Sequence, residues 1–280
     1  MAIGLEDTKL HYVSIREARQ MSGLRIVLGA LAVPGPWREA CKGVFHVKGL
    51  AYTPVRSANE GASDGMIGMN GTQSELVAWT AQSSAPVVAW NDERPRSLWN
   101  DQLQLAERLA PGAALIPAAF EDRVRMFGLA NELLGEGGLL FSKRHFMSGP
   151  ALAALPPGRP ERAVLEFLAR KYDYSDAALA GATARIVGIL GGLDAQLAAQ
   201  RARGRRYLIG DALSALDVYW AASCGFLDPM PADRCPMAES FRAPHLYGVP
   251  NEAIDRALTA ALRAHRDFVY ERHLELPIVF

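Results

Sequence analysis

The sequence predicts two domains, an α/β domain followed by an all-helical domain, and three observations support this. The chain has 280 residues, half of them hydrophobic, which is a length typical of about two domains. Short apolar runs alternate with helical patterns before about Pro111, whereas the pattern after about Glu121 is helical throughout. We therefore expect an N-terminal extension at residues 1–22, an α/β domain at 23–110, a linker over Ala110–Phe120 and helices at 121–280.

The first domain begins with a βαβ pattern. Ser14 and Glu17 have the spacing of a capping box, which predicts a short helix in the extension. The predicted unit consists of a strand at Leu24–Leu31 buried on both faces, a helix at Trp37–Lys48 and a second strand at Ala51–Arg56. Pro36 fits the first turn of that helix and Gly49 its C-terminal end. Pro54 predicts an edge position or a bulge for the second strand.

The rest of the first domain contains a loop, a short helix and one or two further strands. Residues 61–71 are rich in Gly, Ser, Asn and Met and predict a surface loop. A helical turn at Glu75–Trp79 and a strand at Ala85–Trp90 follow, and Asn91-Asp92 predicts a turn. We then expect a strand or its remnant and a helix that ends near Leu109.

The second domain shows the spacing of amphipathic helices. In one of these patterns Ile186, Leu190, Leu193 and Leu197 recur one turn apart. The predicted helices are Arg123–Leu134, Glu161–Tyr172, Ala177–Gln200, Ser214–Ala222 and Glu252–His273. Together they predict a helical bundle.

Charge and cysteine content exclude several classes of function. Lys and Arg together number 30, as do Asp and Glu, so no bulk charge attracts nucleic acid or an anionic membrane, and we expect neither partner. No apolar run is long enough to cross a bilayer and the first residues lack a signal-peptide pattern, which predicts a cytoplasmic protein. Three cysteines without a C-x-x-C pair argue against a disulfide framework. The scattered histidines predict no catalytic metal.

Three segments resemble sequence signatures of one known protein family. Residues 75–86, ELVAWTAQSSAP, resemble the stretch that precedes the family's cis-proline. Residues 207–217, YLIGDALSALD, resemble the signature late in its helical domain, and Cys41–Tyr52 resembles the first helix and its exit. The resemblance covers about Leu24–Ala222 and implies a thioredoxin-like glutathione-binding domain followed by the all-helical glutathione transferase domain. It also implies a homodimer with glutathione as co-substrate.

The resemblance implies where glutathione would bind. Ala85 precedes the expected cis-proline, Pro86, and would present its backbone N–H and C=O to the cysteinyl part of glutathione. Ser97 would bind the γ-glutamyl carboxylate with its hydroxyl and, as a helix N-cap, with neighbouring N–H groups. Arg96 stands where the family has an acidic or amide residue. An arginine there favours binding of the γ-glutamyl carboxylate. It leaves the γ-glutamyl amine without its usual acidic partner, which Asp92, Glu93 or another subunit would have to supply. The alternative is that Ser97 is only a helix cap.

The sequence departs from the family at the residue that activates the thiol. The position that carries Ser or Cys in several classes falls on Gly35, and the tyrosine of other classes is also missing. The catalytic group is therefore unknown, with Trp37 and Arg38 as candidates beside backbone N–H groups and the helix dipole. Arg38 would stabilise a thiolate or lie on the surface, and Trp37 would stack on substrate or pack in the interior. Cys41 is expected in the core.

The helical domain is expected to supply the second-substrate pocket. Its candidate lining consists of Trp37, Asn131 and Arg144, with Glu132, Glu136, Phe141 and His145 nearby. Residues 135–138, GEGG, predict a widened or kinked helix. The leading hypothesis is an enzyme that conjugates the glutathione thiolate to an apolar electrophile. The alternatives are a non-catalytic glutathione- or ligand-binding or scaffold protein, which the missing hydroxyl favours, and thirdly a glutathione-dependent reductase, which the missing thiol disfavours.

Ser214 and Asp217 form a second capping pattern at the start of a predicted helix. We expect a structural role for this pair, in which the hydroxyl accepts from early N–H groups of the helix and the carboxylate favours its positive end.

Overall fold

The computed structural model describes residues 10–29, 33–61 and 73–280, and the chain divides into two compact units. The first consists of Met1–Gly112, Pro231–Ala238 and Glu275–Phe280, and the second of Ala113–Met230 and Glu239–Leu274. The prediction placed all of 121–280 in the helical domain. Pro231–Ala238 and Glu275–Phe280 belong instead to the first unit. Local sequence patterns do not reveal such a return of the chain.

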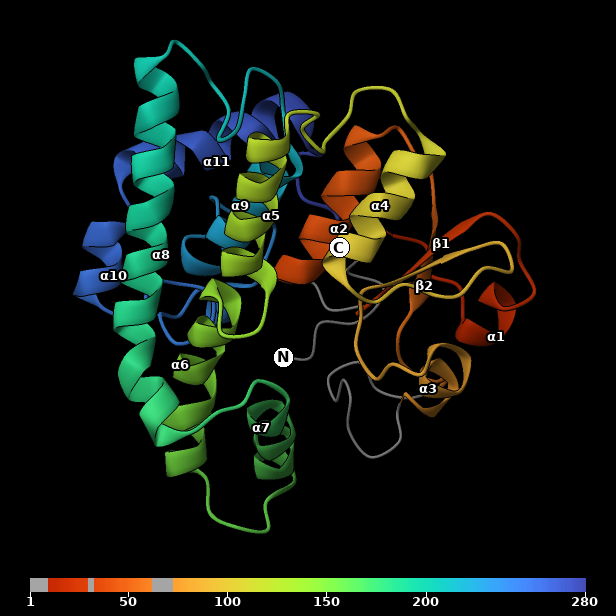
Figure 1. The fold of residues 1–280 in the computed structure, drawn as a ribbon. Coiled ribbons are helices and arrows are strands. Elements are labelled where there is room, and N and C mark those ends of the chain that lie inside the picture. Colours follow the sequence, from red (N-terminus) through yellow and green to blue (C-terminus); the bar gives the residue numbers. More distant parts are fainter. Residues whose placement is uncertain (1–9, 30–32, 62–72) are drawn as a thin grey trace. The chain divides into compact units, whose positions relative to one another are not determined.

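The first unit contains a three-stranded mixed sheet (Figure 1). Its strands are β1 (Leu24–Leu28), β2 (Thr53–Arg56) and β3 (Val87–Trp90), in the order β2-β1-β3. β1 pairs in parallel with β2 and antiparallel with β3. All five residues of β1 are buried, as predicted, including Arg25, whose guanidinium donates to the carbonyl oxygen of Ala18 at 2.9 Å. β2, with Pro54, lies at an edge of the three-strand order. The α/β fold class is confirmed.

Two single bridges extend this sheet. Val88 and Arg96 exchange both backbone hydrogen bonds at 2.8 Å, which is the remnant of the expected fourth strand. On the other side, Val13 forms a parallel bridge with Val55, so the N-terminal extension lies along β2. The predicted loop at 61–71 lies, apart from Gly61, outside the described residues, as do positions 30 and 31 of the predicted first strand.

In the described part of the first unit, the helices beside the sheet are α1 (Ile15–Ala18), α2 (Pro36–Val47), α3 (Ser74–Thr80) and α4 (Trp99–Leu109). The Ser14–Glu17 capping box begins α1 as predicted. α2 packs against α4, and α1 against α3. One core cluster joins α1 and α3 to the sheet through Ile15, Ala18, Leu76 and one valine from each strand, Val27, Val55 and Val87.

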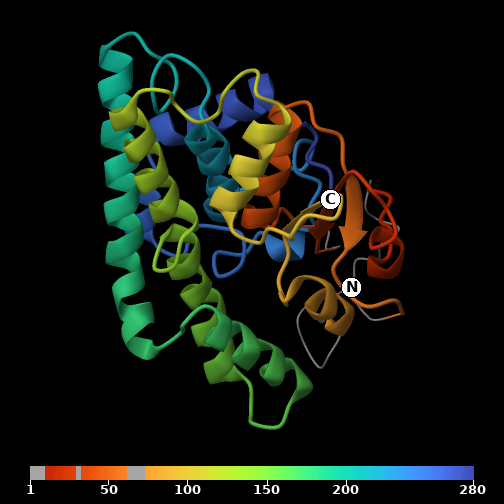
Figure 2. The same cartoon turned by 45° about the vertical axis from the view of Figure 1, so that its right-hand side comes forward.

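The second unit is all-helical, as predicted. Its helices are α5 (Phe120–Leu134), α6 (Leu139–Ala154), α7 (Pro160–Lys171), α8 (Asp176–Ala202), α9 (Ala215–Leu227), α10 (Glu252–Ala257) and α11 (Ala260–His273), with a 3-10 turn, η3 (Glu239–Phe241). α6 lies beside α8 in both Figure 1 and Figure 2, and α5 packs against α9. The predicted last helix, Glu252–His273, is two helices because Thr259 caps α11 by accepting a hydrogen bond from Leu262 N.

The glycines at 135–138 form a turn between α5 and α6 rather than a widened or kinked helix. Gly135 is the C-cap residue of α5, and Gly138 is the N-cap residue of α6. A Cβ at Gly138 would lie 2.6 Å from the carbonyl oxygen of Glu132, and Gly137 has a φ of +66°. Only glycine fits such a close approach and such a backbone, so this turn ends the first long helix.

Asp217 at the start of α9 is fully buried and accepts four hydrogen bonds. Its Oδ2 accepts from Ser214 N and Ser214 Oγ at 2.9 and 2.8 Å, and its Oδ1 lies 2.8 Å from both Leu208 N and His265 Nε2. The predicted capping pair is confirmed, and the Ser214 hydroxyl donates to the carboxylate. Asp217 therefore connects α9 to α11 and to the chain that precedes it.

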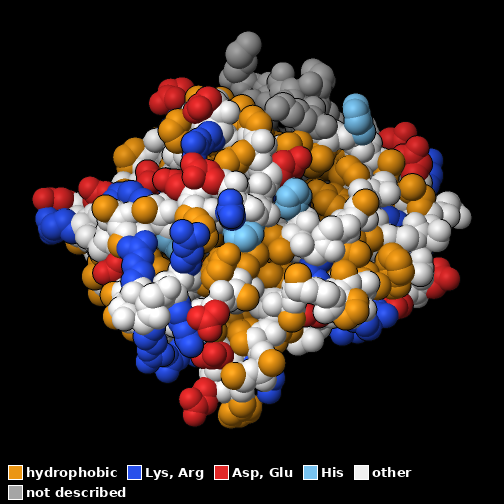
Figure 3. Space-filling view, turned by 90° about the horizontal axis from the view of Figure 1, so that it is seen from above, with side chains coloured by type: hydrophobic (Ala, Val, Ile, Leu, Met, Phe, Trp, Pro, Cys, Tyr) orange, Lys and Arg blue, Asp and Glu red, His pale blue; other side chains and the backbone are white. Residues whose placement is uncertain are grey.

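In the described part of the chain, α8 alone has the length and mean hydropathy of a membrane span. Its residues Ile186, Leu190, Leu193 and Leu197 are buried within the helical unit, as the spacing predicts. Core helices of this kind meet the same criteria, so α8 is weak support for a membrane span. On the face shown in Figure 3, positive and negative side chains are interspersed, in keeping with the zero net charge.

Candidate functional site

The strand ends and the start of α2 define the candidate glutathione site of the first unit. The register pairs Val27 with Val87, so Ala85 and Pro86 lie next to the carboxyl end of β1, from which the chain leads to α2. The Ala85–Pro86 bond is cis, as expected from the resemblance. Ala85 is half-buried and Pro86 is buried. Backbone groups suited to an extended peptide are therefore placed close to a helix N-terminus.

Gln102 of α4 joins two parts of this site. Its Nε2 donates to the carbonyl oxygens of Pro86 and Arg96 at 3.2 and 3.3 Å, and its side chain is buried. The antiparallel bridge between Val88 and Arg96 places Ser97 on the side toward Val87 and Pro86. Sequence reasoning missed Gln102, because a glutamine in an amphipathic helix is usually exposed.

Ser97 is not the N-cap of α4. The helix begins at Trp99 with Leu98 as its N-cap residue, and no side chain caps it. Ser97 is half-buried and lies two residues before the helix. The prediction misplaced the cap by one residue because the serine pattern alone does not fix the backbone turn. The hydroxyl of Ser97 and the N–H groups of the first turn both remain candidates for carboxylate binding.

Arg96 forms an ion pair with Glu93. The guanidinium Nη2 lies 2.5 Å from Glu93 Oε2, and Arg108 Nη2 lies 2.6 Å from the same oxygen. Hydrogen bonds from Arg108 and Arg96 lower the pKa of Glu93. Glu93, a possible partner for the glutathione amine, is therefore already paired with two arginines, and the charge of Arg96 is balanced within the same turn.

Arg38 is buried, with 6% of its surface exposed, so it does not lie on the protein surface. Its guanidinium donates to the carbonyl oxygens of Gly29 and Val33, and its Nε lies 3.3 Å from Glu39 Oε1. These two carbonyls flank the connection between β1 and α2. Trp37 beside it is half-buried. Arg38 thus holds Gly29 and Val33, and Val33 lies two residues before Gly35, the residue at the α2 N-cap.

The end of the chain packs against α2. Lys42 Nζ donates to the carbonyl of Val279 and lies 2.9 Å from Glu39 Oε2, while the Arg38 guanidinium lies 5.9 Å from the centre of the Phe280 ring. Cys41 on the same helix is buried, and burial raises the pKa of its thiol. The core position expected for Cys41 is confirmed, and a buried neutral thiol is a poor nucleophile.

Asn131 and Arg144 belong to the second unit, whereas Trp37 belongs to the first, so their grouping into one pocket stays a prediction. Asn131 is exposed at the end of α5. The Arg144 guanidinium lies 4.7 Å from the Phe226 ring centre and 5.3 Å from that of Tyr172. Two aromatic rings therefore hold this cation in place.

The neighbours of Arg144 on α6, Lys143 and His145, are buried basic residues. Lys143 is fully buried, and burial, with a smaller contribution from the charge of Arg144, lowers its pKa to about 7. Its Nζ donates to the carbonyl of Pro244 at 2.7 Å. Burial also lowers the pKa of His145, whose Nδ1 has no hydrogen-bond partner in the described part of the chain. Arg144 itself is half-buried. The burial of Lys143 and His145 was not predicted, since Lys is rarely buried and His only sometimes.

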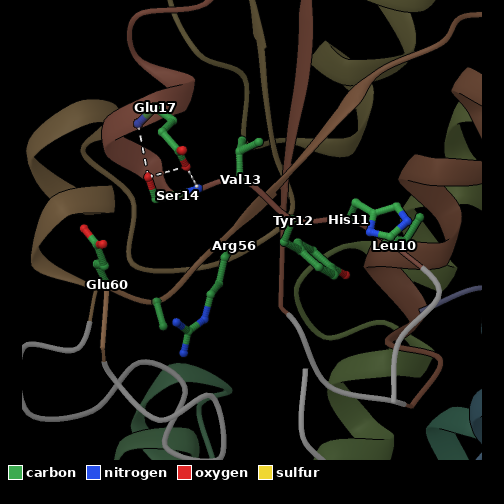
Figure 4. A pocket seen from close by; sticks show the side chains of 9 residues that line it. Leu10, His11, Tyr12, Val13, Ser14, Glu17, Arg56 and Glu60 are labelled. Atoms are coloured by element: carbon green, nitrogen blue, oxygen red, sulfur yellow. Dashed lines mark hydrogen bonds between the residues drawn. The ribbon is translucent and has the colours of Figure 1, made fainter. Parts of the chain in front are cut away.

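A pocket of about 470 Å³ lies beside the N-terminal segment (Figure 4). Leu10–Ser14 and Glu17 line it, together with Arg56, Ala58 and Glu60. The Glu17 carboxylate is bonded to Ser14 rather than turned toward Arg56. The sequence did not predict this pocket. Of its lining residues, only Ser14 and Glu17 had been singled out, as the capping box of α1. Within the described ranges, no three His, Cys, Asp or Glu side chains meet as a metal site.

No protein-family model and no curated protein matches this chain. Solved structures match it over most of its length. A glutathione S-transferase from Methylobacterium radiotolerans, in complex with glutathione sulfonate, has 16% identity and a TM-score of 0.56, covering 90% of this chain and 92% of that chain.

Two further structures show the same similarity. A beta-etherase from Sphingobium sp. strain SYK-6 has 14% identity and a TM-score of 0.54, covering 88% of this chain and 99% of that chain. A glutathione S-transferase from Rhodospirillum rubrum F11 has 13% identity and a TM-score of 0.51, covering 89% and 88%. At such identities the similarity shows a shared fold.

Proposed function

Because the chain has the glutathione S-transferase fold, we propose that it is a glutathione-dependent transferase that conjugates the glutathione thiolate to an apolar electrophile. The similar structure from Methylobacterium radiotolerans holds glutathione sulfonate, which supports glutathione as the ligand class. The two proposed substrates are glutathione and a small hydrophobic electrophile.

The observation that supports this proposal best is the link that Gln102 makes between Pro86 and Arg96. This link fixes the backbone next to Ala85, with which an extended tripeptide would pair. Ser97 and Arg96 would then bind the γ-glutamyl carboxylate at one end of that tripeptide. Backbone pairing supplies affinity, and a nearby hydroxyl and cation orient one end of the peptide. Glutathione would then place its thiol toward the start of α2.

The start of α2 would lower the pKa of the thiol. Gly35 offers no side-chain cap, so the positive end of the helix dipole and first-turn N–H groups face that region. Arg38 acts as a positioning residue, because its donors go to Gly29 and Val33 rather than outward. A thiolate held beside the electrophile reacts faster through proximity and its higher nucleophilicity.

The second candidate function is non-catalytic binding of glutathione or another ligand on the same fold. The specific observation in its favour is Gly35, which supplies neither the hydroxyl nor the thiol that usually activates glutathione. A glutathione-dependent reductase is disfavoured because Cys41, the cysteine on α2, is buried with a raised pKa.

Calorimetry with glutathione separates these functions. We expect the wild-type protein to bind glutathione and Ser97→Ala to bind it more weakly. Ultraviolet titration of the bound thiol is expected to show a lowered pKa. Arg38→Ala would raise it again, because Gly29 and Val33 would lose the guanidinium that binds their carbonyls. Absence of glutathione binding overturns both glutathione functions. Binding with an unshifted thiol pKa supports the non-catalytic function.

A further inference from the structure

A pocket of about 350 Å³ lies at the end of the sheet opposite the candidate glutathione site. β3 begins directly after Pro86 and ends at Trp90, and Asn91 of the following turn lines this pocket. A strand of that length keeps Pro86 and Asn91 roughly 15 Å apart. All the lining residues belong to the first unit. A ligand bound here would therefore leave the candidate glutathione site free.

Arg25 of β1 and Ala89 of β3 line this pocket from the sheet. The two residues are paired neighbours in the antiparallel ladder, so their side chains lie on one face. Val27 follows Arg25 by two residues and belongs to the core cluster with residues of α1 and α3, so this is the face that these helices cover. The short side chain of Ala89 leaves space beside Arg25 that a larger residue would fill.

Arg25 brings a buried positive charge to the pocket. It is 2% exposed, and its guanidinium donates to the carbonyl oxygens of Ala18, Met21 and Asn91. Its Nε is buried without a hydrogen-bond partner, and no carboxylate pairs with it in the described part of the chain. Buried donors are nearly always satisfied, and buried charges are usually paired. Arg25 therefore suits a ligand whose acceptor atoms are negatively charged.

The other charged side chains leave an excess of positive charge at the pocket. Arg19, the C-cap residue of α1, is exposed and pairs with no carboxylate among the described residues. Arg94 already has a carboxylate partner on α4, and Glu93 is paired with two arginines. Asp92 is the remaining carboxylate of the lining, and it is exposed. Two guanidinium groups without a paired carboxylate thus line the pocket together with one such carboxylate.

Asp92 sets a second requirement on a ligand. Burial lowers the pKa of Arg25, and the negative charge of Asp92 raises it, so Asp92 lies near enough for the two charges to interact. A carboxylate accepts hydrogen bonds and repels another anion. A ligand that turns negative charge toward Arg25 must therefore turn neutral donors, such as hydroxyl groups, toward Asp92.

Trp79 of α3 supplies an aromatic surface. Its ring packs against the core cluster and lies 5.8 Å from Arg25 Cζ, so it is held in place. The side chain is half-buried and lines the pocket, which leaves part of the ring available to a ligand. An indole ring stacks well on a planar ring, nucleic-acid bases included. The pocket therefore combines a stacking surface, two arginines and one acceptor carboxylate.

We infer that this pocket is a second small-molecule site, which binds a nucleoside monophosphate. The base stacks on Trp79, Arg19 and Arg25 bind the phosphate, and the sugar hydroxyls donate to Asp92. A phosphate monoester carries about 1.5 to 2 negative charges at neutral pH, which matches two arginines better than the single charge of a carboxylate does. The volume is within the usual range of small-molecule sites. The inference is independent of the proposed function, because the two sites lie at opposite ends of the sheet.

Calorimetry with adenosine 5′-monophosphate, adenosine and ribose 5-phosphate tests the site, because the last two compounds each lack one recognised group. The wild type should bind the nucleotide at least about tenfold more tightly than either. Arg19→Gln should weaken nucleotide binding about tenfold and leave adenosine binding unchanged. Trp79→Leu should weaken nucleotide binding and leave ribose 5-phosphate binding unchanged. Arg16→Gln, at an exposed arginine of α1 that does not line this pocket, is the matched control and should change neither.

Glutathione provides a second measurement that separates the two sites. Saturating glutathione should leave nucleotide affinity unchanged, and Arg19→Gln should bind glutathione like the wild type. Absence of nucleotide binding, or equal affinity for the nucleotide and either of its parts, overturns the inference. So does displacement of the nucleotide by glutathione, or equal nucleotide affinity in wild type and Arg19→Gln. Failure of the wild type to bind glutathione overturns the proposed function alone, and nucleotide binding in that protein would still support this site.

Discussion

Nε2 of Gln102 lies 3.2 Å from the carbonyl oxygen of Pro86, and the same atom donates to Arg96 O. One amide group thus ties the residue after Ala85 to the bridge that replaces a fourth strand. Gln102→Met keeps the volume and removes the donor. We expect glutathione affinity to fall about tenfold by calorimetry and the unfolding free energy to fall by about 1 kcal/mol.

Gln104→Met is the matched control for this change. Gln104 lies on α4 two residues away and is exposed. Its replacement should alter neither affinity nor stability. Equal glutathione affinity in Gln102→Met and Gln104→Met would show that the link does not position the ligand.

The sequence was sufficient to predict the strands and most of the helices, because the hydrophobic patterns that indicate them lie within each segment. The four apolar residues of β1 and the spacing of Ile186, Leu190 and Leu193 on α8 each correspond to burial in the structure. The break before α11 was not predictable. Thr259 donates to Asp194 Oδ1 at 2.6 Å while it caps α11, and periodicity does not reveal a contact between distant residues.

The site was predictable where a motif marks the backbone, as at Ala85 and Pro86, and not where a buried polar side chain supports it. Gln102, Arg38 and Lys143 are all buried, although their residue types are usually exposed. Their positions depend on the carbonyls of Pro86, Gly29 and Pro244, respectively, to which they donate. These partners lie from 9 to 101 residues away in the sequence. Pairing over such separations has no signal in a single sequence.

Gly35→Ser should increase transferase activity. A Cβ at Gly35 would lie 3.6 Å from Arg38 Cβ and 3.7 Å from Arg38 Nε, which are ordinary contacts, so the hydroxyl can be accommodated. A hydrogen bond to a thiolate stabilises the charged form. We expect a lower pKa of the bound thiol and about tenfold faster conjugation with 1-chloro-2,4-dinitrobenzene.

The control for Gly35→Ser is Gly112→Ser, at an exposed glycine of the same unit where a Cβ meets no atom within 4 Å. That variant should match the wild type in both measurements. If Gly35→Ser binds glutathione normally but changes neither thiol pKa nor rate, the thiol does not lie at the start of α2.

Asp217→Asn should destabilise the helical unit. The carboxylate accepts from Leu208 N, Ser214 N, Ser214 Oγ and His265 Nε2, so an amide would turn a donor toward other donors. We expect the unfolding free energy to fall by about 3 kcal/mol or more in denaturant titration. Asp211→Asn breaks an exposed pair with Arg205 and should cost about 1 kcal/mol at most. Similar losses in the two variants would contradict the role given to Asp217.

Lys143 should make stability depend on pH above neutrality. Its pKa is about 7 in the fold, against an ordinary value of 10.5, because burial and the charge of Arg144 disfavour the ammonium form. Between these values the unfolded chain holds a proton that the folded chain has released, so unfolding takes up a proton and a higher pH opposes it. Below pH 7 both states are protonated and this dependence stops. Relative to Lys143→Met, the unfolding free energy of the wild type should therefore rise from about pH 7 to about pH 9, by at most about 1.4 kcal/mol per pH unit.

The slope is the informative quantity, because Lys143→Met also removes the donor to Pro244 O and shifts stability by an amount that does not vary with pH. Denaturant titrations of both proteins at several pH values give the difference directly. Lys171→Met, at a partly exposed lysine on α7, controls for the loss of a lysine elsewhere in the same unit. Parallel stability profiles for wild type and Lys143→Met across this range would mean that Lys143 keeps its proton in the fold, and that the carbonyl of Pro244 and the ring of Phe226 compensate for its burial.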